Sequence, residues 1–517
     1  MQVVAVVVLA LAGLFLASLF ALYSYGRFAR RARGAPSTAV PVVDGATALD
    51  RFVAPLVQEA HGRTGLMLLA DNLDAFAIRV LAARRAGRSL DLQYYFWKND
   101  LTGRLLAHEI VSAADRGVRV RLLLDDINAH GSDRVYRALA THPNIDIRLF
   151  NPSRNREGSV GRAVEMVLRA FRVTRRMHNK AWIADGRLAI VGGRNIGDAY
   201  FDADPAANFR DLDVLLVGPA VGQTEAVFDA FWNSDAAIPM AALRWARKGA
   251  LARLRKALAG AVDHDQAQPY FKRVAEDETV LALLSGQWRL HWTAEAKVVS
   301  DPPEKVRGLG EAGWLINAIA PLLKSGRSRL EIISPYFIPG EIGARQLLET
   351  AARGVRVSVL TNSLAATDVT AVHGAYAPYR RPLVEGGIEL FELKPYDHRS
   401  DRSLFGSSGA SLHTKAFTID DRLGFIGSMN FDPRSISLNS EMGVIFEHED
   451  LVREARTIFA DESSPRKSYR VEVEDGRIVW RDFADGAART LREEPEASLW
   501  RRLAAAAIGL LPLQSQL

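Results

Sequence analysis

The chain has 517 residues, too many for one ordinary hydrophobic core, so its length predicts two or more domains. Its 48% hydrophobic and 24% charged residues exclude an intrinsically disordered chain, and a net charge of +6 is too small to indicate nucleic-acid binding by itself. The absence of cysteine excludes disulfide bonds, thiolate catalysis and cysteine-ligated zinc.

An uncharged run opens the chain, MQVVAVVVLALAGLFLASLFALYSYG (1–26), and it is long enough to cross a bilayer as a helix. A cleaved signal peptide would have a basic start and a shorter apolar core, and a buried core helix is a less favoured alternative. Arginines follow at once, at positions 27, 30, 31 and 33. Because basic residues flank membrane segments on the cytoplasmic side, the run predicts a single anchor with the body of the chain in the cytoplasm.

Two stretches repeat the same polar residues 235 positions apart, HNKAWIADGRLAIVGGRN (178–195) and HTKAFTIDDRLGFIGSMN (413–430). Other blocks repeat in the same order, such as AADRGVRVRLLLDD (113–126) and AARGVRVSVLTNS (351–363). Blocks that keep their order and nearly their spacing indicate a duplicated domain and not a short solenoid repeat.

Each copy contains the same alternation of secondary structure. A strand-like run, 90–96 or 330–337, precedes a helix-like stretch that ends in Arg-Gly, and a Val-rich strand follows. This alternation predicts α/β units around a mostly parallel sheet. The expected fold class is therefore α/β, with two duplicated lobes packed about a pseudo-twofold axis behind one N-terminal transmembrane helix. The expected domains are an anchor (1–26), a basic flank and linker (27–50), a first lobe (51–236), an inter-lobe segment (237–300), and a second lobe with a C-terminal tail (301–517).

Between the copies, ALRWARKGALARLRKAL (242–258) has the pattern of a basic amphipathic helix. Leu251, Leu254 and Leu258 share one helical face, and arginine and lysine residues supply the positive charge. Such a helix often lies on a membrane surface, and a packed helix with a solvated basic face explains the pattern equally well.

The repeated stretches bring together a histidine and a lysine. His178 and Lys180 are two residues apart, as are His413 and Lys415, and residues two apart on a strand point to the same face. The ammonium group would repel a metal ion, but it would hold a phosphate while the imidazole attacks or donates a proton. Two such pairs brought together by a twofold axis supply a nucleophile on one side of a phosphodiester and a general acid on the other. We therefore expect no metal and no other cofactor.

The aspartates of the two stretches have a different expected role. Asp185 and Asp420 each lie seven residues after the histidine, an odd number, so they should point away from the histidine face. Asp-Gly at 185–186 also predicts a tight hairpin turn. We expect both aspartates to be structural anchors at a hairpin corner.

Four further residues complete the candidate site. Asn195 and Asn430 can donate hydrogen bonds to the phosphate oxygens. Asp211 and Glu441 occupy matching positions in the two copies, where a carboxylate on the far ring nitrogen would fix the tautomer of a histidine. The histidine of the first copy is expected to be the nucleophile and that of the second the general acid, although near symmetry makes the reverse assignment almost equally favoured.

The paired His-x-Lys-x4-Asp motifs resemble the signature of the phospholipase D superfamily. LDLQYYFW, RGVRVRLLLDDIN, GGRNIGDAYF, ISPYFIPG and SLNSEMGVI resemble its bacterial cardiolipin synthase branch, closest to the C-type members, and the resemblance covers roughly residues 60–515. It implies a bilobal α/β fold, a phosphohistidine intermediate, no metal, and phosphatidyl transfer to a hydroxyl of phosphatidylglycerol. A single N-terminal anchor differs from the double span of the A-type enzymes. The motifs place the catalytic residues at His178, Lys180, Asp185, His413, Lys415 and Asp420.

The favoured function is that of a membrane phosphatidyltransferase that makes cardiolipin from phosphatidylglycerol and a second phospholipid, for which phosphatidylethanolamine is a candidate. A phospholipase D-type hydrolase that releases phosphatidic acid is the alternative, and a nuclease or a catalytically silent scaffold is less favoured. No dense basic stripe with interleaved aromatic residues indicates a nucleic-acid partner. The expected location is the bacterial inner membrane, and nothing in the sequence indicates an oligomeric state.

A segment after the second Val-rich strand, TNSLAATDVTAVHGAYAPYRR (361–381), offers candidate contacts to a lipid head group. An ordinary helix face is the equally weighted alternative. The candidate residues are Asn362, His373, Tyr376 and Arg380.

Overall fold

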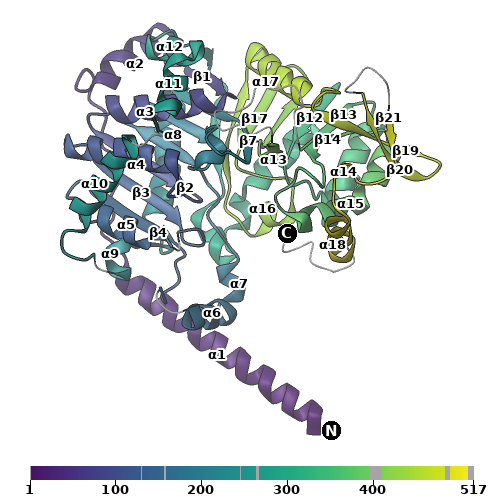
Figure 1. Cartoon of the computed structure of the whole chain (residues 1–517), viewed down its shortest axis with the longest axis horizontal. Coiled ribbons are helices and arrows are strands. Elements are labelled where there is room, and N and C mark those ends of the chain that lie inside the picture. The colour runs from purple at the N-terminus through teal and green to yellow at the C-terminus, as the bar shows by residue number, and fades with distance from the viewer. Residues whose placement is uncertain are drawn as a thin grey trace.

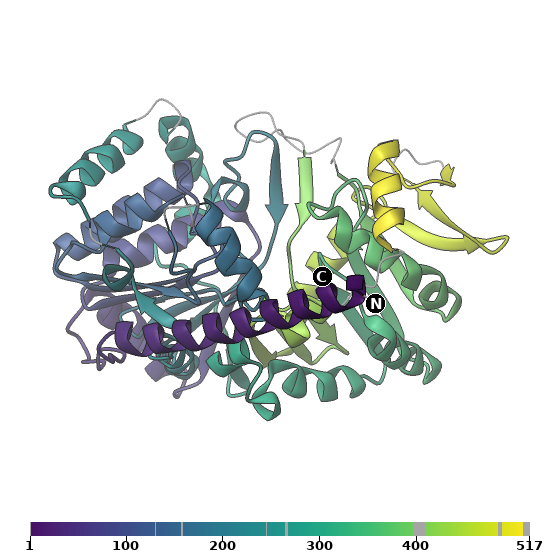
Figure 2. The same ribbon diagram turned by 90° about the horizontal axis from the view of Figure 1, so that it is seen from below.

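The computed structural model describes residues 2–129, 131–156, 159–244, 246–263, 267–395, 409–483 and 489–509. Over these residues the chain forms two lobes side by side, each built on a β-sheet covered by helices (Figure 1). A long helix, α1 (Gln2–Ala32), projects from the first lobe beneath the second (Figure 2). Among the described residues, it is the one helix long and apolar enough to cross a membrane.

The first sheet has the strand order β10-β1-β8-β6-β5-β2-β3-β4-β9. Its strands are β1 (Thr64–Leu69), β2 (Ser89–Tyr94), β3 (Arg119–Asp125), β4 (Ile145–Phe150), β5 (Ala181–Ala184), β6 (Leu188–Gly192), β8 (Asp213–Val217), β9 (Ala237–Pro239) and β10 (His291–Thr293). The central strands are buried on both faces, as their continuous hydrophobic sequences predict.

The second sheet has the strand order β11-β18-β17-β16-β12-β13-β14-β19-β20-β21. Its strands are β11 (Ala296–Ser300), β12 (Arg329–Ile333), β13 (Arg356–Asn362), β14 (Glu389–Leu393), β16 (Ala416–Ile419), β17 (Leu423–Gly427), β18 (Met442–Glu447), β19 (Ser468–Glu474), β20 (Arg477–Asp482) and β21 (Arg489–Leu491). The six strands from β18 to β14 repeat the order from β8 to β4 in the first sheet. The duplication predicted from the sequence is therefore present in the topology.

The prediction of a mostly parallel sheet was wrong. In the first sheet only β2, β3 and β4 are parallel, and in the second only β12, β13 and β14. The reason is the length of the connections. Helical crossovers join the parallel strands, whereas short turns join β5 to β6 and β16 to β17 and force these neighbours to run antiparallel.

Helices cover both faces of each sheet and a shared core joins the lobes. The helices of the first lobe are α2 (Ala48–Glu59), α3 (Asn72–Arg85), α4 (Leu101–Asp115), α5 (Asp133–Leu139), α6 (Ser159–Leu168), α7 (Ala170–Val173), α8 (Pro219–Trp232), α9 (Met240–Leu243), α10 (Ala250–Val262), α11 (Ala267–Glu276) and α12 (Glu278–Leu284). Those of the second are α13 (Leu315–Lys324), α14 (Gly340–Ala352), α15 (Thr370–Glu385), α16 (Pro433–Ser437), α17 (Glu449–Glu462) and α18 (Leu499–Gly509). One buried hydrophobic cluster contains Leu216 and Phe228 of the first lobe together with Phe446 and Leu451 of the second. The lobes are thus packed as one body.

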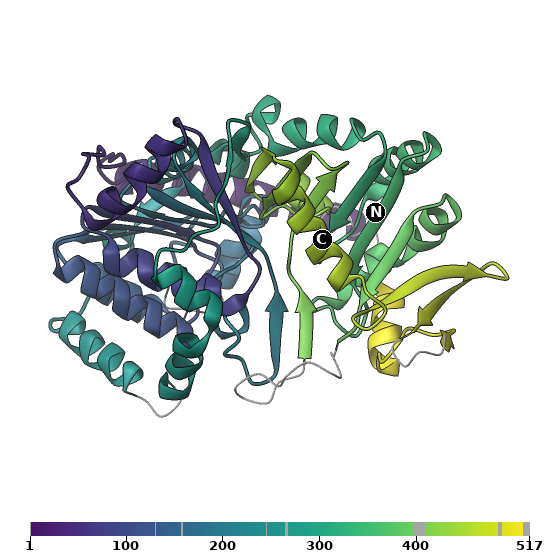
Figure 3. The same ribbon diagram turned by 90° about the horizontal axis from the view of Figure 1, so that it is seen from above.

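Two short strands also pair across the boundary. β7 (Ala207–Arg210) and β15 (Gly409–Leu412) run parallel to each other and stand side by side between the lobes (Figure 3). Because His413 directly follows β15, this pairing ties the second motif to the first lobe. The backbone N–H of His413 also donates to the carbonyl of Arg210 at 2.8 Å. The first motif is tied in the same way, since the N–H of His178 donates to the carbonyl of Ser440 at 2.8 Å.

The segment 237–300, expected to link the lobes, contributes β9 and β10 to the first sheet and β11 to the second. The single helix expected over 242–258 is not formed. Instead α9 ends at Leu243 and α10 begins at Ala250. Leu258 is buried in the core of the first lobe and α10 packs against α4. Leu254 also packs against this core, so most of the leucine face contacts protein, which favours the packed-helix interpretation over a membrane-surface helix.

Candidate active site

Each motif sits where a hairpin begins. His178 and Lys180 directly precede β5, which pairs with β6, and His413 and Lys415 directly precede β16, which pairs with β17. All four side chains are buried or nearly so, with at most 8% of each residue exposed. The pseudo-twofold arrangement of the lobes brings the two hairpin starts together at the boundary.

Each histidine is bonded to a carboxylate of the opposite lobe. The Nδ1 atom of His178 lies 2.8 Å from Oε2 of Glu441, and Nδ1 of His413 lies 2.5 Å from Oδ2 of Asp211. A carboxylate at Nδ1 holds the proton there and leaves Nε2 as the free nitrogen of the neutral ring. The two carboxylates are the pair that the sequence predicted, but the exchange between lobes could not be predicted from an alignment of the two copies.

The lysines lie against their own histidines. Nζ of Lys180 donates to the carbonyl of His178 at 2.7 Å, and Nζ of Lys415 donates to the carbonyl of His413 and lies 3.1 Å from its Nδ1. Both ammonium groups are thereby held at the site, with further N–H bonds left for an anion. A phosphodiester placed between the histidines would find a positive charge on each side.

The two asparagines occupy equivalent places and share an unusual feature. Asn195 donates from Nδ2 to the hydroxyl of Tyr200 at 3.1 Å, and its amide oxygen is buried without a partner among the described atoms. The amide oxygen of Asn430 is likewise buried without a partner in the described part of the chain. Buried polar atoms are nearly always bonded, so a matched pair of unpaired amide oxygens indicates acceptors available to a hydrogen-bond donor of a bound molecule.

Three side chains that sequence reasoning did not select complete the site. Tyr200 packs edge-on against His413, with ring centroids 5.1 Å apart, and its hydroxyl lies 3.5 Å from Nε2. Tyr95 packs in the same way against His178 at 5.0 Å. Ser428 donates to the Glu441 carboxylate at 2.5 Å. Both tyrosines lie in sequence blocks that carried the family resemblance, so that resemblance was the signal that could have found them.

In the first copy, Gly193 stands at the position that Ser428 has in the second copy, and the reason is steric. A Cβ atom at Gly193 would lie 2.1 Å from the Oδ1 atom of Asp211. The shorter aspartate can approach His413 only if its own hairpin leaves this space empty, whereas the longer Glu441 reaches His178 past a serine. The two half-sites are therefore similar but not identical.

Burial dominates the protonation of the site. It lowers the pKa of His178 to about 4, with Glu441 opposing the shift and Lys180 adding to it. The pKa of His413 is also lowered, first by burial and then by Lys415. Burial lowers the pKa of Lys180 to about 7 and that of Lys415 to about 8. Near neutral pH the imidazoles are therefore neutral and able to attack, and a bound phosphate would favour the charged form of both lysines.

These pKa values predict a bell-shaped dependence of kcat/KM on pH. Below about pH 4, His178 takes up a proton and cannot attack, so kcat/KM should fall as the pH drops through that value. As the pH rises, His413 first loses the proton that a general acid needs. Lys180 and Lys415 then lose their protons at about pH 7 and 8, and with them their attraction for phosphate, so kcat/KM should fall on the alkaline side. The measurement uses short-chain phosphatidylglycerol from pH 3 to 10. A rate that stays constant up to pH 10 would contradict the assignment of the alkaline limb.

The motif aspartates lie at the hairpin corners. Asp185 is fully buried in a left-handed conformation, and its carboxylate accepts hydrogen bonds from the backbone N–H groups of Gly87, Arg88 and Ser89. Asp420 makes the same contacts with the backbone of residues 327–329 in the second lobe. Both carboxylates therefore tie a hairpin to the loop before the first parallel strand and do not contact a histidine.

Replacing Asp185 by Asn should lower the free energy of unfolding by roughly 2–4 kcal/mol. The amide cannot accept from all the backbone N–H groups that the carboxylate satisfies, and each buried N–H group left without an acceptor costs about 1–3 kcal/mol. The melting temperature of the purified protein in detergent measures the loss. Asp44→Asn is the matched control, since the side chain of Asp44 is 83% exposed. The folded variant should keep kcat within a few-fold. A variant that melts normally but turns over slowly would show that Asp185 acts in the reaction.

Three of the four candidate head-group contacts in 361–381 lie inside the second lobe and away from the two motifs. Arg380 is buried and forms ion pairs with Glu392 and Glu494, and Tyr376 donates to Glu392. His373 lies 3.3 Å from Glu494 in the same network. These residues hold α15 inside the second lobe, so the helix-packing alternative is correct for them. Asn362 is different, because it bonds to both backbone groups of Leu412, directly before His413.

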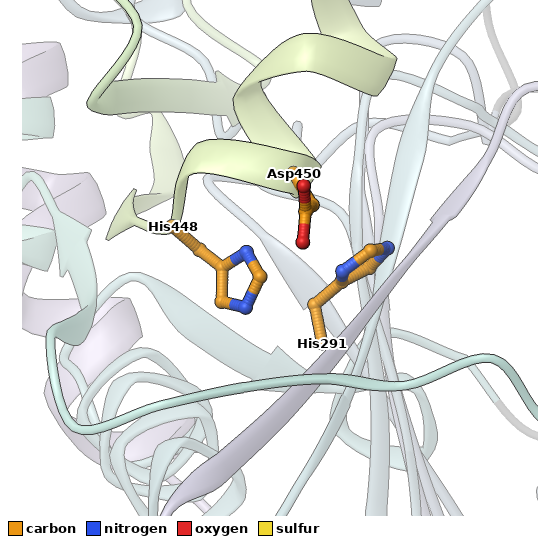
Figure 4. Close-up of side chains that lie close together, drawn as sticks. All are labelled: His291, His448 and Asp450. Carbon is orange, nitrogen blue, oxygen red and sulfur yellow. The ribbon is translucent and has the colours of Figure 1, made fainter.

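Two groups of described side chains have donor atoms close enough to hold a metal ion. One is His291, His448 and Asp450, where β10 of the first lobe meets the start of α17, and these three side chains converge in Figure 4. The other is His373 with Glu392 and Glu494. Neither group contains a residue of the two motifs, and a metal-free reaction remains a prediction.

A family model described as "Cardiolipin synthase, PLD-like domain" matches residues 81–232 and 319–462, one segment in each lobe and together more than half of the chain. The chain belongs to this family. It is an enzyme of the phospholipase D superfamily, and the family and fold predicted from the paired motifs are confirmed.

Individual relatives match most of the chain. "Cardiolipin synthase C" of Escherichia coli (strain K12) is 39% identical over 468 residues, which are 89% of this chain and 98% of the relative. "Cardiolipin synthase" of Staphylococcus aureus (strain Mu50) is 23% identical over 82% of this chain and 72% of its own. The solved structure of phosphatidylserine synthase from Haemophilus influenzae Rd KW20 has the same fold, with a TM-score of 0.52 and 14% identity over 81% of this chain and 91% of that one.

Proposed function

We propose that this protein is a membrane phosphatidyltransferase that makes cardiolipin from phosphatidylglycerol and a second phospholipid. The observation that carries the proposal is the pair of histidine–lysine sets at the lobe boundary, each with a carboxylate from the opposite lobe. The names of the relatives support phospholipids as substrates, among which phosphatidylglycerol and phosphatidylethanolamine are the candidates.

In the first half-reaction, Nε2 of His178 attacks the phosphorus of the donor lipid. A P–N bond forms, the P–O bond to the leaving alcohol breaks, and His413 gives its proton to the leaving oxygen. The anionic phosphodiester favours the protonated form of His413 and offsets the effect of burial on its pKa. Lys180 and Lys415 hold the phosphate oxygens, and Glu441 stabilises the positive charge that develops on His178.

In the second half-reaction, His413 acts as a base. It takes the proton of a primary hydroxyl on a phosphatidylglycerol molecule, the hydroxyl oxygen attacks phosphorus, and the P–N bond breaks to restore His178. Water is the competing acceptor. A lipid alcohol held in place can reach effective molarities of about 10⁵ M or more, which exceeds the concentration of water by orders of magnitude.

We also propose that α1 crosses the bacterial inner membrane with both lobes on the cytoplasmic side. The four arginines directly after the apolar run support this orientation. An anchored enzyme meets phosphatidylglycerol in the same leaflet, which supplies the acceptor at high local concentration.

The products formed in vesicles test the function. With phosphatidylglycerol as the only lipid, cardiolipin is expected as the main product and phosphatidic acid as a minor one, at the same rate with or without a chelator. His178→Ala protein in the same vesicles is the blank. Phosphatidic acid as the dominant product would assign the chain to the hydrolases, and cleavage of DNA without any lipid product would assign it to the nucleases.

A further inference from the structure

Helix α6 exposes apolar side chains on its outward face. Val160, Val164 and Val167 are 75%, 53% and 63% exposed, and Met166 is 37% exposed. The three valines are spaced i, i+4 and i+7, so they lie on one side of the helix. A surface helix in water normally places such a stripe against the core, which makes this arrangement an inversion of the usual one.

α6 carries two charged side chains away from this stripe, of which Arg162 is half-buried and Glu165 points toward the protein. The Glu165 carboxylate accepts the backbone N–H bonds of Arg154 and Asn155 at 2.9 Å each, and it pairs with Arg169 at 2.6 Å. Its side chain is only 10% exposed. Glu165 therefore makes its contacts with the protein, whereas the apolar face of α6 is exposed.

The position of α6 along α1 indicates what those surroundings are. The described side chains of α1 are exposed from Val4 to Ala17, and partial burial begins at Ser18. The segment from residue 2 to residue 18 rises by about 25 Å, close to the ~30 Å thickness of a hydrocarbon layer. α6 packs beside α1 where this segment ends (Figure 1), and a cavity of about 320 Å³ between the two helices is lined by Val164 but not by Val160 or Val167.

We propose that α6 is a membrane-docking helix whose outward valines insert between the lipids around α1. The proposal rests on the proposed crossing of the membrane by α1, because the apolar face of α6 continues the lipid-facing surface of that helix. A helix in this position lies in the interface plane with its apolar side among the acyl chains.

This docking would fix the height of the active site above the membrane. Arg169, directly after α6, stacks on Tyr25 of α1 at 3.3 Å and donates to the amide oxygen of Asn151 at 3.1 Å. The chain then reaches His178 within ten residues of the end of α6. The proposed docking helix and the nucleophile are thus parts of one continuous segment.

The natural absence of cysteine allows a direct test. Full-length Val167→Cys, Leu281→Cys and Leu11→Cys proteins are labelled with a fluorophore and reconstituted into phosphatidylglycerol vesicles. Val167 is chosen because it does not line the cavity beside α1. Leu281 is the matched control, because it is 50% exposed on α12, at the opposite end of the first lobe from α6 in Figure 1. Leu11 lies in the lipid-facing part of α1 and reports whether the anchor is inserted.

The label at position 167 should be quenched by nitroxide lipids and be several-fold less accessible to iodide than the label at 281. Equal iodide quenching at 167 and 281, with position 11 quenched by nitroxide lipids, would overturn the docking proposal and leave the anchor intact. An unquenched label at 11 would instead overturn the membrane crossing itself. Shielding of position 167 that disappears as the protein-to-lipid ratio is lowered would show that a second copy covers the face, which also overturns the proposal.

A charge on the face gives an independent measurement. Val167→Glu should lower the ratio of turnover on vesicles to turnover on soluble short-chain phosphatidylglycerol by about tenfold, while Leu281→Glu should leave this ratio unchanged. An unaltered ratio in Val167→Glu would mean that insertion of α6 does not position the site.

Discussion

Replacing His178 by Ala is expected to abolish phosphatidyl transfer, with kcat reduced by roughly 10⁴-fold or more. Losses of that size follow removal of a covalent nucleophile, because binding and charge stabilisation alone recover only a small part of the rate. The ring of His178 is held by Glu441 and lies close to Lys180, so its removal leaves no nucleophile on that side of the phosphate. Cardiolipin formation in vesicles measures the rate, and His108→Ala on α4 is the control for a histidine outside the site.

The alanine variants of the two histidines should stop the reaction at different steps. His413→Ala retains the nucleophile but lacks the group that protonates the leaving alcohol and later activates the acceptor, so a donor with a good leaving group should leave the phosphatidyl group on His178. Mass spectrometry of the intact protein should detect one adduct per chain in His413→Ala and none in His178→Ala. The opposite pattern would exchange the two roles. A His413→Ala protein with full activity would contradict the two-histidine mechanism.

The second large effect is expected from the carboxylates. Glu441→Gln and Asp211→Asn should each lower kcat by about 10²–10⁴-fold. An amide can donate a proton to Nδ1 of its histidine, which then carries its own proton on Nε2, the atom that must attack or receive a proton. Both variants should keep the melting temperature within a few degrees, since each amide matches the carboxylate in size and can still bond to Nδ1 of its histidine. Both carboxylates stay ionised in the wild type. Burial alone would raise the pKa of each, but contact with the histidine and the nearby lysine outweighs burial and lowers it.

A matched control separates this effect from the loss of any buried ion pair. Glu109 is 8% exposed and forms an ion pair with Arg84 between α4 and α3 of the first lobe. Glu109→Gln should retain kcat. If Glu441→Gln turns over at the wild-type rate, the carboxylate does not set the tautomer of His178 and the role proposed for it is wrong.

The sequence predicted the elements that depend on local pattern. The Asp-Gly turn correctly placed the hairpin of β5 and β6, and residue parity placed Asp185 away from the histidine. Sheet direction was mispredicted because it depends on which strands become neighbours, and strand alternation alone does not encode this. Tyr200 was missed for a similar reason, since it reaches His413 only across the lobe boundary.

The carboxylates show the same limit most clearly. Aligning the two copies matched Asp211 with Glu441, and the match indicated a shared task. An alignment compares a residue with its counterpart and carries no information about which copy's histidine it will contact. Only the docking of the lobes, through a common hydrophobic core and the pairing of β7 with β15, decides that each carboxylate crosses to the other side.

This crossing makes the two halves of the gene depend on each other. Each copy encodes the partner of the other copy's histidine, so a mutation that inactivates one half also disables the residues that remain intact in the other. Neither half can drift into a separate single-motif enzyme without first acquiring a new carboxylate for its own ring. Selection therefore acts on the duplicated chain as one inseparable unit, and a break between the lobes would cost both half-reactions at once.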